Sequence, residues 1–453
     1  KYQGLSYPEI WISEAQERMV AAVPADKLEQ ALAIFRAEDV EATVLGTFPG
    51  HGRLHLHYHG ELVADLAMPF LHDGIPRLHR PAHFRPAAEP ADVLPGAAPE
   101  AHLKALLACP NIASKEWVIR QYDHEVQAGS IIKPLVGVHR AGPSDAAVVA
   151  PLPGRDRGVA IACGLNTRYG DVDAYHAAAA GIEEALRNLV CVGAALDRVA
   201  LLDNFSWGRC DKPANLGALV RACEACYDLA TFYRTPFVSG KDSLNNEFVH
   251  HGTTITIPHT LLITAMTVVE DVTRCVTMDV KAPGDAVFVV GSTRRELGGS
   301  EWFAVCGGSG GRVPRLDKDR SKAVLTAVAA CVRQGLANAV HDCSEGGLGV
   351  TLAEMAFAGG LGLEIDADRV PREGDVDRLD VLLFSESLSR FVLTVPADKV
   401  NAARRQLAAV PHEFIGTVVA EPRLAIRGLG ASLQARIDDL EKVWREGLAV
   451  VAE

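Results

Sequence analysis

The sequence predicts an α+β protein built from a duplicated two-domain unit, with the first copy of that unit truncated. Two observations predict this fold class. Strand-like apolar runs alternate with helical patterns along the chain. In addition, the segment SEAQERMVAAVPADK (13–27) returns near the end of the chain as SESLSRFVLTVPADK (385–399). A length of 453 residues allows two to four domains, which leaves room for such a duplication.

The two related segments share more than a common strand-turn-helix pattern. In each, a strand-like run (MVAAV or FVLTV) ends at a proline, where a strand must stop, and a helical pattern follows. A further short strand-like run comes after each helix, VLGTF at 44–48 and FIGTVV at 414–419. Pro-Ala-Asp-Lys is identical in both copies, which favours duplication over chance. The spacing is far too long for a solenoid repeat.

The duplication predicts where the domains lie. We expect the second copy to be whole, with domains at 116–283 and 284–453 that meet at APGD. We expect residues 1–115 to supply only the tail of the first copy and a linker rich in Pro and Ala at 76–102. Because the chain starts at Lys1 rather than Met, we expect that its natural beginning is missing. A site shared by the two copies would then be incomplete here.

The second copy contains clear helix and strand patterns. Strands are expected at 148–152, 158–164, 198–205, 253–257, 261–269 and 286–291. Helices are expected at 173–194, 214–235, 319–335 and 346–358. The GGSGGR loop (307–312) is expected to give flexibility. Strand-to-helix junctions in such folds are where small ligands usually bind.

Composition excludes some partners. With 45 Lys and Arg against 57 Asp and Glu, the net charge is −12, which argues against nucleic acid or an anionic membrane as the main partner. Acidic proteins can still bind phosphates through magnesium, which prefers carboxylates. No run approaches the roughly 20 apolar residues of a membrane helix. The ten cysteines are scattered, which indicates reduced thiols in a cytoplasmic protein.

The stretch HDCSEGGLGV (341–350) is the first candidate site. A strand-like run ends at His341-Asp342, and Ser344 can cap the helix that EGGLG opens. An anion at that helix start would meet free N–H groups, and Asp342 could hold a metal that bridges phosphates. The alternative is an ordinary N-cap with a glycine-rich turn.

The second candidate site offers oxygen ligands from two segments. Glu184 and Asn188 lie four residues apart, on one face of the helix expected at 173–194, and together suit magnesium. Asp145 follows a Gly-Pro turn in GPSDAAVV. A solvent-exposed helix face and an ordinary turn are the alternatives for these residues.

The third candidate combines LLDNFSWG (201–208) with VSGKDSLNNE (238–247). Each apolar run ends in a polar cluster, as strand-end sites usually do. Asp203 could bind a nucleotide or a metal, and Lys241 or the backbone of Gly240 could meet phosphate. Gly-Lys-Asp-Ser is not a P-loop, so a pair of ordinary turns remains the alternative.

Taken together, five motifs in order make a specific resemblance. LLDNFSWG, TPFVSGKDSL, QYDHEVQ, ELGGSEW and HDCSEGGL resemble those of the phosphoribosylformylglycinamidine synthase family over nearly the whole chain. That family has duplicated domain pairs of the aminoimidazole-ribonucleotide-synthetase (PurM-like) type, which would explain the repeated segment. The resemblance implies an ATP-dependent carbon–nitrogen ligase of purine biosynthesis. ATP activates the formamide oxygen of formylglycinamide ribonucleotide, and ammonia from a glutaminase domain or subunit then attacks.

The resemblance also assigns an active-site group. Glu14 and Gln16 fall on the family's substrate-contacting Glu-Ser-Gln, with Ala15 in place of Ser. Asp203 and Gly240 fall on ATP contacts, and Ser243 falls on a substrate contact. Lys241 stands where the short bacterial form has a magnesium-binding Asn, which puts a metal there in doubt.

A second, auxiliary nucleotide site is implied by the long form of the family. Its magnesium ligands would be Asp145, Glu184, Asn188 and Asp342. Ala146 and Ser344 would contact the ATP or ADP.

The family's catalytic histidine motif and a glutaminase Cys/His pair have no match in the sequence. We therefore expect no catalytic residue in this chain, and expect it to bind nucleotide but to need the missing first-repeat half for turnover. Two alternatives stay open. One is another ATP-using relative of the selenophosphate or thiamine-phosphate type. The other is a non-catalytic scaffold that a nucleotide stiffens and that docks a glutaminase.

Overall fold

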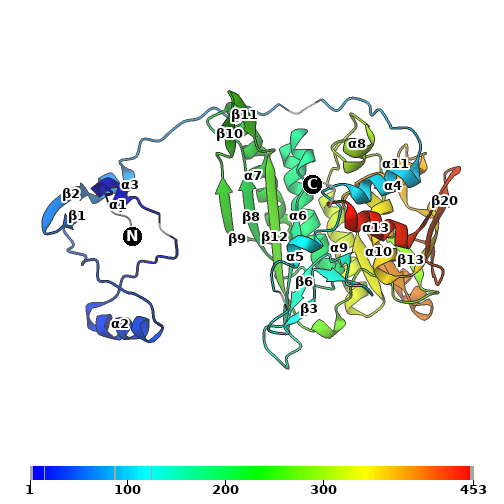
Figure 1. The fold of residues 1–453 in the computed structure, drawn as a ribbon, viewed down its shortest axis with the longest axis horizontal. Coiled ribbons are helices and arrows are strands. Elements are labelled where there is room, and N and C mark those ends of the chain that lie inside the picture. Colours follow the sequence, from blue (N-terminus) through cyan, green and yellow to red (C-terminus); the bar gives the residue numbers. More distant parts are fainter. Residues whose placement is uncertain (1–3, 15, 86–87, 124, 449–453) are drawn as a thin grey trace. The chain divides into compact units, whose positions relative to one another are not determined.

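A computed structural model describes residues 4–14, 16–85, 88–123 and 125–448 of the chain (Figure 1). The chain divides into two compact units, residues 1–79 and 80–453. No helix in the described residues is both long enough and apolar enough to cross a membrane. All ten cysteines lie in the described part, and each is free.

The smaller unit holds few regular elements. These are helices α1 (Tyr7–Trp11), α2 (Leu28–Ala37) and α3 (Met68–Asp73) and a hairpin of β1 (Arg53–Tyr58) and β2 (Glu61–Ala67). The strands expected at 19–23 and 44–48 are absent, so that expectation was wrong. In the second copy the same pattern does form strands, β18 (Phe391–Val395) and β19 (His412–Val419).

The repeated segment keeps its local structure even without those strands. In both copies Pro-Ala-Asp-Lys forms a 3-10 turn, at Ala25–Lys27 and at Ala397–Lys399, that leads into a helix. Arg18 donates a hydrogen bond to the carbonyl of Ser13, and its counterpart Arg390 donates to the carbonyl of Ser385. Both copies of the repeated segment thus keep the same turn and the same contact from side chain to backbone.

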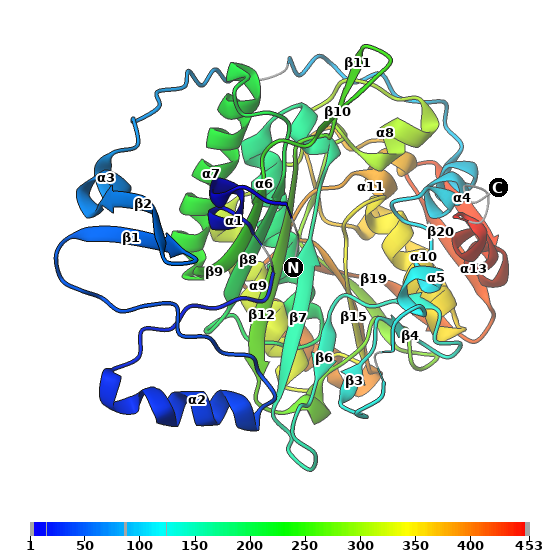
Figure 2. The ribbon, with the colours of Figure 1, turned by 60° about the vertical axis from the view of Figure 1, so that its left-hand side comes forward.

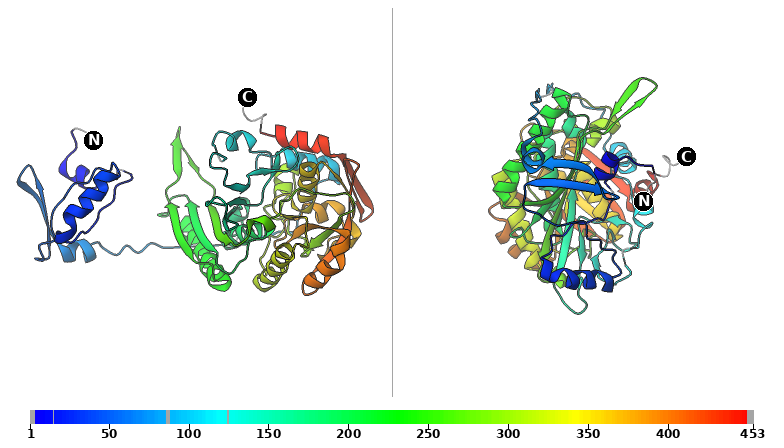
Figure 3. Two further views of the ribbon diagram at one scale, coloured as in Figure 1. Left: turned by 90° about the horizontal axis from the view of Figure 1, so that it is seen from below. Right: turned by 90° about the vertical axis from the view of Figure 1, so that its left-hand side faces the viewer.

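The larger unit contains two main sheets, which lie at opposite sides of it (Figure 3, green strands against orange and red). The first sheet has six strands in the order β3-β6-β7-β12-β8-β9. All neighbours in it are antiparallel except β8 and β9. The strands are β3 (Ser130–Ile132), β6 (Ala147–Val149), β7 (Gly158–Gly164), β8 (Ala200–Ser206), β9 (Phe237–Ser243) and β12 (Thr260–Val269). Small hairpins pair β4 (Leu135–Val136) with β5 (Gly142–Pro143) and β10 (Glu247–His250) with β11 (Thr253–Thr256).

The second sheet has seven strands in the order β15-β18-β13-β19-β16-β20-β21. Only β16 and β20 are parallel. Beside β18 and β19, its strands are β13 (Ala286–Val290), β15 (Ala339–Asp342), β16 (Gly362–Asp366), β20 (Arg423–Gly428) and β21 (Ala431–Arg436). A short parallel pair, β14 (Thr293–Arg294) and β17 (Arg372–Glu373), stands apart.

Helices fill the space around these sheets. The long helices α6 (Ala174–Cys191) and α7 (Pro213–Tyr233) lie side by side against the first sheet (Figures 1 and 2). The other helices of this unit are α4 (Pro99–Ala108), α5 (Glu116–Ile119), α8 (Glu301–Cys306), α9 (Lys318–Arg333), α10 (Gly347–Gly359), α11 (Leu379–Phe384), α12 (Val400–Leu407) and α13 (Ile437–Glu446). Helices α6, α7, α9 and α10 confirm the four expected helices. Because α6 also contacts α9 and β15, one hydrophobic core runs through the unit.

The expected linker is a docked strap rather than a free segment. Residues 89–95 run along the glycine loop 307–312: Val93 and Ser309 exchange backbone hydrogen bonds, and the N–H of Gly311 donates to the carbonyl of Pro90. Asp92 pairs with Arg295 at 2.8 Å, and Glu89 with Arg315 at 2.7 Å. The strap and α4 therefore belong to the larger unit. The expectation that the glycine loop gives flexibility was wrong, since its glycines let a backbone approach closely.

Glu386 joins three segments inside the larger unit. Its carboxylate accepts hydrogen bonds from the Tyr169 hydroxyl at 2.6 Å, the Gly346 N–H at 2.9 Å and the Glu301 N–H at 3.0 Å. Tyr169 belongs to a short 3-10 turn (Arg168–Asp171), Gly346 precedes α10 and Glu301 begins α8. One buried carboxylate thus ties residues of both expected domains together.

The strap predicts a difference between two glycine substitutions. A Cβ on Gly310 would lie 2.7 Å from the carbonyl oxygen of Ala91, whereas a Cβ on Gly307 would meet nothing within 4 Å. Both residues have positive φ (73° and 83°), so both alanine variants carry a similar left-handed strain of about 1 kcal/mol. We expect Gly310→Ala to cost about 1–3 kcal/mol more than Gly307→Ala in urea unfolding. Equal losses would contradict the docked strap.

Glu386 predicts a pH dependence of stability. Burial raises the pKa of Glu386 from 4.5 to about 7 although three donors favour the charged form. A carboxyl with a raised folded-state pKa contributes stability below pH ~4.5 that is lost as pH rises through ~7. Gln has the same shape, can accept from both N–H groups and can donate to Tyr169. As the pH rises from 4.5 to 7.5, the unfolding free energy of Glu386→Gln should increase by about 3 kcal/mol relative to that of wild type. Parallel pH profiles would refute this.

Candidate functional site

The first group of predicted residues meets where α6 contacts the end of β15. Asp342 is the last residue of β15, and its Oδ2 accepts a hydrogen bond from the Arg187 Nε of α6 at 2.9 Å. Arg187 also pairs with Glu183 one helical turn earlier, and all three side chains are almost wholly buried. This ion pair fixes the position of the Asp342 carboxylate. Its Oδ1 accepts a long hydrogen bond of 3.4 Å from Ser344 and lies 3.9 Å from Nδ1 of His341.

Asp145 approaches the same point from the loop between β5 and β6. Its Oδ1 lies 2.8 Å from Nδ1 of His341 and accepts the N–H of Asp342 at 3.1 Å. Ligand atoms of Asp145, His341 and Asp342 all lie within 4.8 Å of one another. Ala146, the next residue, is buried, and its carbonyl accepts the hydroxyl of Ser144.

Glu184 and Asn188 lie on α6 beside Arg187. Glu184 is buried rather than solvent-facing, and its Oε2 accepts the Leu165 N–H at 2.9 Å and the Asn166 amide at 3.1 Å. The Asn188 amide donates to the carbonyl of Cys163 at 3.0 Å. Its oxygen, Oδ1, is buried and has no hydrogen-bond partner in the described residues. An acceptor left unsatisfied in this way is suited to a cation.

Electrostatics show a shortage of positive charge around these groups. Burial, together with Asp342, raises the pKa of Glu184 to about 8 despite the opposing effect of Arg187. Burial and the charges of Glu184 and Glu386 raise the pKa of Glu345 well above its usual value. Burial alone would lower the pKa of His341, but Asp145 and Glu354 raise it well above normal. Hard oxygen donors with an excess of negative charge fit Mg²⁺, so the residues present suit this ion.

The glycine-rich turn differs from its expected form. We expected Ser344 to cap the helix, but α10 begins at Gly347, its N-cap is Gly346, and no side chain caps it. The Gly346 N–H already donates to the Glu386 carboxylate. A Cβ on Gly347 would lie 2.4 Å from the carbonyl of Ser385, so the backbone of 383–385 covers the helix start. The Glu386 carboxylate and the backbone of 383–385 thus already contact the helix start, and an anion bound there stays a prediction.

The second group lies at β8 and β9. Asp203 and Gly240 stand opposite each other on these parallel strands. A Cβ on Gly240 would fall 1.6 Å from Oδ1 of Asp203, so only glycine leaves room for that carboxylate. Burial raises the pKa of Asp203. Ser243 ends β9, and its hydroxyl accepts a hydrogen bond from Lys241.

The third group is Glu14 and Gln16 of the smaller unit. Both are exposed, and the neighbouring Ala15 lies outside the described residues. Their positions are described relative to the smaller unit alone.

Several residues around the first group were not predicted to take part. Arg187, Glu354 and Glu386 are buried and charged. Arg187 had a weak signal, since it lies one residue before Asn188 on the expected helix. The others depend on contacts between residues far apart in the chain.

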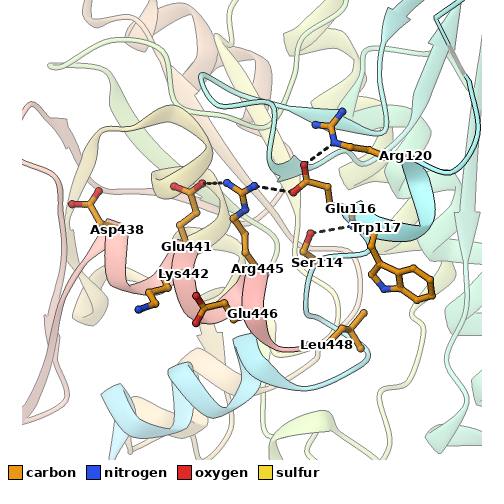
Figure 4. A pocket seen from close by; sticks show the side chains of 10 residues that line it. All are labelled: Ser114, Glu116, Trp117, Arg120, Asp438, Glu441, Lys442, Arg445, Glu446 and Leu448. Atoms are coloured by element: carbon orange, nitrogen blue, oxygen red, sulfur yellow. Dashed lines mark hydrogen bonds and ion pairs between the residues drawn. The ribbon is translucent and has the colours of Figure 1, made fainter. Parts of the chain in front are cut away.

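A separate hollow lies between α5 and α13 (Figure 4). It has a volume of about 1040 Å³. Three of its charged side chains pair with one another: Glu116 binds Arg120 at 2.7 Å and Arg445 at 3.0 Å. None of the predicted site residues lines it.

Comparison with known proteins accounts for the domain pattern. The model of the family "AIR synthase related protein, C-terminal domain" matches residues 3–59 and again 282–428. The model of the corresponding N-terminal domain matches residues 143–262. A match to one C-terminal model in two places confirms the duplication.

Named relatives cover nearly all of the chain. Phosphoribosylformylglycinamidine synthase subunit PurL of Anaeromyxobacter dehalogenans (strain 2CP-C) is 36% identical over 99% of this chain and 59% of its own length. The subunit of the same name from Methanocaldococcus jannaschii is 36% identical over 88% of this chain and 54% of its own. The chain thus spans a little over half of the relatives it matches.

Solved structures confirm the fold class. T. maritima PurL complexed with FGAR matches with a TM-score of 0.58 at 18% identity, over 76% of this chain and 53% of that one. T. maritima PurL complexed with ADP matches with a TM-score of 0.52 at 20% identity, over 71% of this chain and 49% of that one. The two family models and the named relatives together show that the chain belongs to the AIR synthase related protein family and, within it, to the phosphoribosylformylglycinamidine synthase subunits.

Proposed function

We propose that residues 116–453 hold a Mg²⁺–nucleotide complex between α6 and the end of β15. Asp145, Glu184, Asn188 and Asp342 are the metal ligands in this proposal, and Ala146 and Ser344 contact ATP or ADP. The observation that carries it is the oxygen of Asn188, which is buried and has no hydrogen-bond partner in the described residues. It lies one helical turn from Glu184, where the carboxylates outnumber the neighbouring cation Arg187. Magnesium would neutralise nucleotide phosphate charge at this point.

The arrangement suits stable nucleotide binding rather than turnover. Asp342 is fixed by Arg187 and Asp145 by His341, so the metal-facing oxygens are preorganised. The ring of His341, the nearby group best suited to act as a base, already has both nitrogens engaged with carboxylates. This site therefore acts as a structural nucleotide site that strengthens the contact between the domains at 116–283 and 284–453.

We further propose that the chain contributes part of a separate active site. Asp203 and Gly240 contact ATP there, and Ser243 contacts formylglycinamide ribonucleotide. For the smaller unit, taken by itself, the proposal is that Glu14 and Gln16 contact such a ribonucleotide. The close fit of Gly240 against Asp203 supports a backbone position that a ligand can approach. Lys241, bonded to Ser243, offers no metal ligand.

The reaction proposed for the assembled enzyme is an ATP-dependent amidation. Phosphoryl transfer to the formamide oxygen makes it a leaving group, and ammonia from glutamine, supplied by a glutaminase partner, displaces it. The catalytic base comes from the remaining part of the longer relatives. Ten free thiols support a reducing compartment such as the cytoplasm for this work.

The nucleotide site predicts a metal-dependent affinity. We expect the nucleotide-stripped chain to bind Mg²⁺–ADP in calorimetric titration and Asp342→Asn, which keeps the shape of the residue, to lose at least about tenfold in affinity. Asp285→Asn is the matched control. Asp285 is equally buried and accepts a hydrogen bond from Asn338, just before β15. We expect the control to bind within about twofold of wild type. No binding by the wild-type chain would contradict the proposal.

The incomplete active site predicts no turnover by this chain alone. With ATP, Mg²⁺, ammonia and formylglycinamide ribonucleotide, we expect no amidine product. Adding a chain that supplies the first-repeat half should restore product formation, and Ser243→Ala should then raise KM for the ribonucleotide. Product formed by the isolated chain would disprove the proposal that turnover needs the first-repeat half. Tight nucleotide binding without activity even after addition would favour a scaffold that docks a glutaminase.

A further inference from the structure

One histidine ring bridges two buried carboxylates beside the proposed metal site. Nδ1 of His341 lies 2.8 Å from Oδ1 of Asp145, and Nε2 lies 3.0 Å from Oε2 of Glu354. The three side chains are 7%, 2% and 11% exposed. They come from β15, the β5–β6 loop and α10, and Asp145 lies 196 residues before His341.

His341 is close enough to Asp145 and Asp342 to be considered a third metal ligand. Both of its ring nitrogens, however, already face carboxylate oxygens. A histidine needs a bare nitrogen to ligate, and Mg²⁺ prefers oxygen. The ring therefore belongs to the layer of groups that support the ligands.

The support falls on a ligand whose own segment is short. Asp145 lies between two-residue β5 and three-residue β6, so its loop has little regular structure to fix it. Oδ1 of Asp145 lies 2.8 Å from Nδ1 of the His341 ring and accepts the Asp342 N–H at 3.1 Å, and the Cys191 thiol also contacts the Asp145 carboxylate. Glu354, on the rigid helix α10, in turn fixes the ring from its other side.

We propose that His341, held by Glu354, is a positioning residue that orients the Asp145 carboxylate toward the cation of the nucleotide site and is not itself a ligand. This inference rests on the proposed nucleotide-binding function. It adds a chain of hydrogen bonds, Glu354–His341–Asp145, that runs from α10 through β15 to the β5–β6 loop. This chain of hydrogen bonds sets the affinity for the metal. Outer partners of this kind change metal affinity by about 10- to 100-fold when they are removed.

Two substitutions of His341 separate positioning from mere packing. The amide nitrogen of Asn lies close to the position of Nδ1, and that of Gln close to Nε2. His341→Asn therefore keeps the donor to Asp145 and loses the contact with Glu354. His341→Gln does the reverse. Each variant removes the ring and one hydrogen bond. A purely structural role of His341 therefore predicts that both variants change the affinity for Mg²⁺–ADP to a similar extent.

The measurement is calorimetric titration of the full chain with Mg²⁺–ADP and with ADP in EDTA, beside urea unfolding of the free protein. We expect Gln to weaken Mg²⁺–ADP binding by about 10- to 100-fold. The affinity of His341→Asn for Mg²⁺–ADP should stay within about threefold of that of wild type. Binding of ADP in EDTA should be the same for both. Equal Mg²⁺-dependent affinities of Asn and Gln would overturn the proposal.

A second variant covers a folding failure of His341→Gln. Glu354→Gln keeps the volume and an acceptor for Nε2 but removes the charge that fixes the ring. It should weaken Mg²⁺–ADP binding by at least about threefold and leave binding in EDTA unchanged, and an unchanged Mg²⁺-dependent affinity would overturn the proposal. If the wild-type chain itself fails to bind Mg²⁺–ADP, the proposed function fails, and the inference with it. If the wild-type chain binds Mg²⁺–ADP and the His341 variants bind it with equal affinity, the positioning role of His341 is rejected and the proposed function stands.

Discussion

The buried guanidinium of Arg187 is the contact on which the arrangement of the larger unit depends. It pairs with Glu183 on its own helix and with Asp342 at the end of β15, so it joins the six-stranded and seven-stranded layers. A buried ion pair of this kind is costly to break, because the remaining carboxylates would stay desolvated and unpaired. The same contact sets the rotamer of Asp342. The stability of the domain contact and the geometry of the nucleotide site therefore have one physical origin.

The duplicated segment shows how strongly context decides structure. Met19 and Val20 are 97% and 87% exposed, whereas their counterparts Phe391 and Val392 are fully buried as part of β18. A strand needs neighbours for its backbone groups, and β18 lies between β15 and β13. The smaller unit offers no such neighbours within its described residues. Its local turns survive because they need only contacts within the segment, such as Arg18 to Ser13.

Glu14 and Glu386 occupy equivalent positions in the two copies but have different roles. Glu386 accepts three hydrogen bonds inside the protein and contacts the start of α10. Its counterpart Glu14 is exposed in the smaller unit. A carboxylate committed to three internal donors cannot also contact a substrate. In our proposal the glutamate of this segment therefore contacts substrate in the first copy, as Glu14, and has a structural role in the second copy, as Glu386.

The sequence by itself determined the types of the long elements and the kinds of ligand available. The helices around Glu184 and Arg187 and the strand that ends at Asp342 follow from periodicity, which is a local property. The motifs also indicated the family. Only the tertiary structure decided which side chains meet: Asp145 with His341, Arg187 with Asp342, and Glu386 with the start of α10. It also decided that the Pro-rich segment docks on the glycine loop 307–312 and that residues 19–23 form no strand. Contacts between residues far apart depend on how whole layers pack, and no local pattern carries that information.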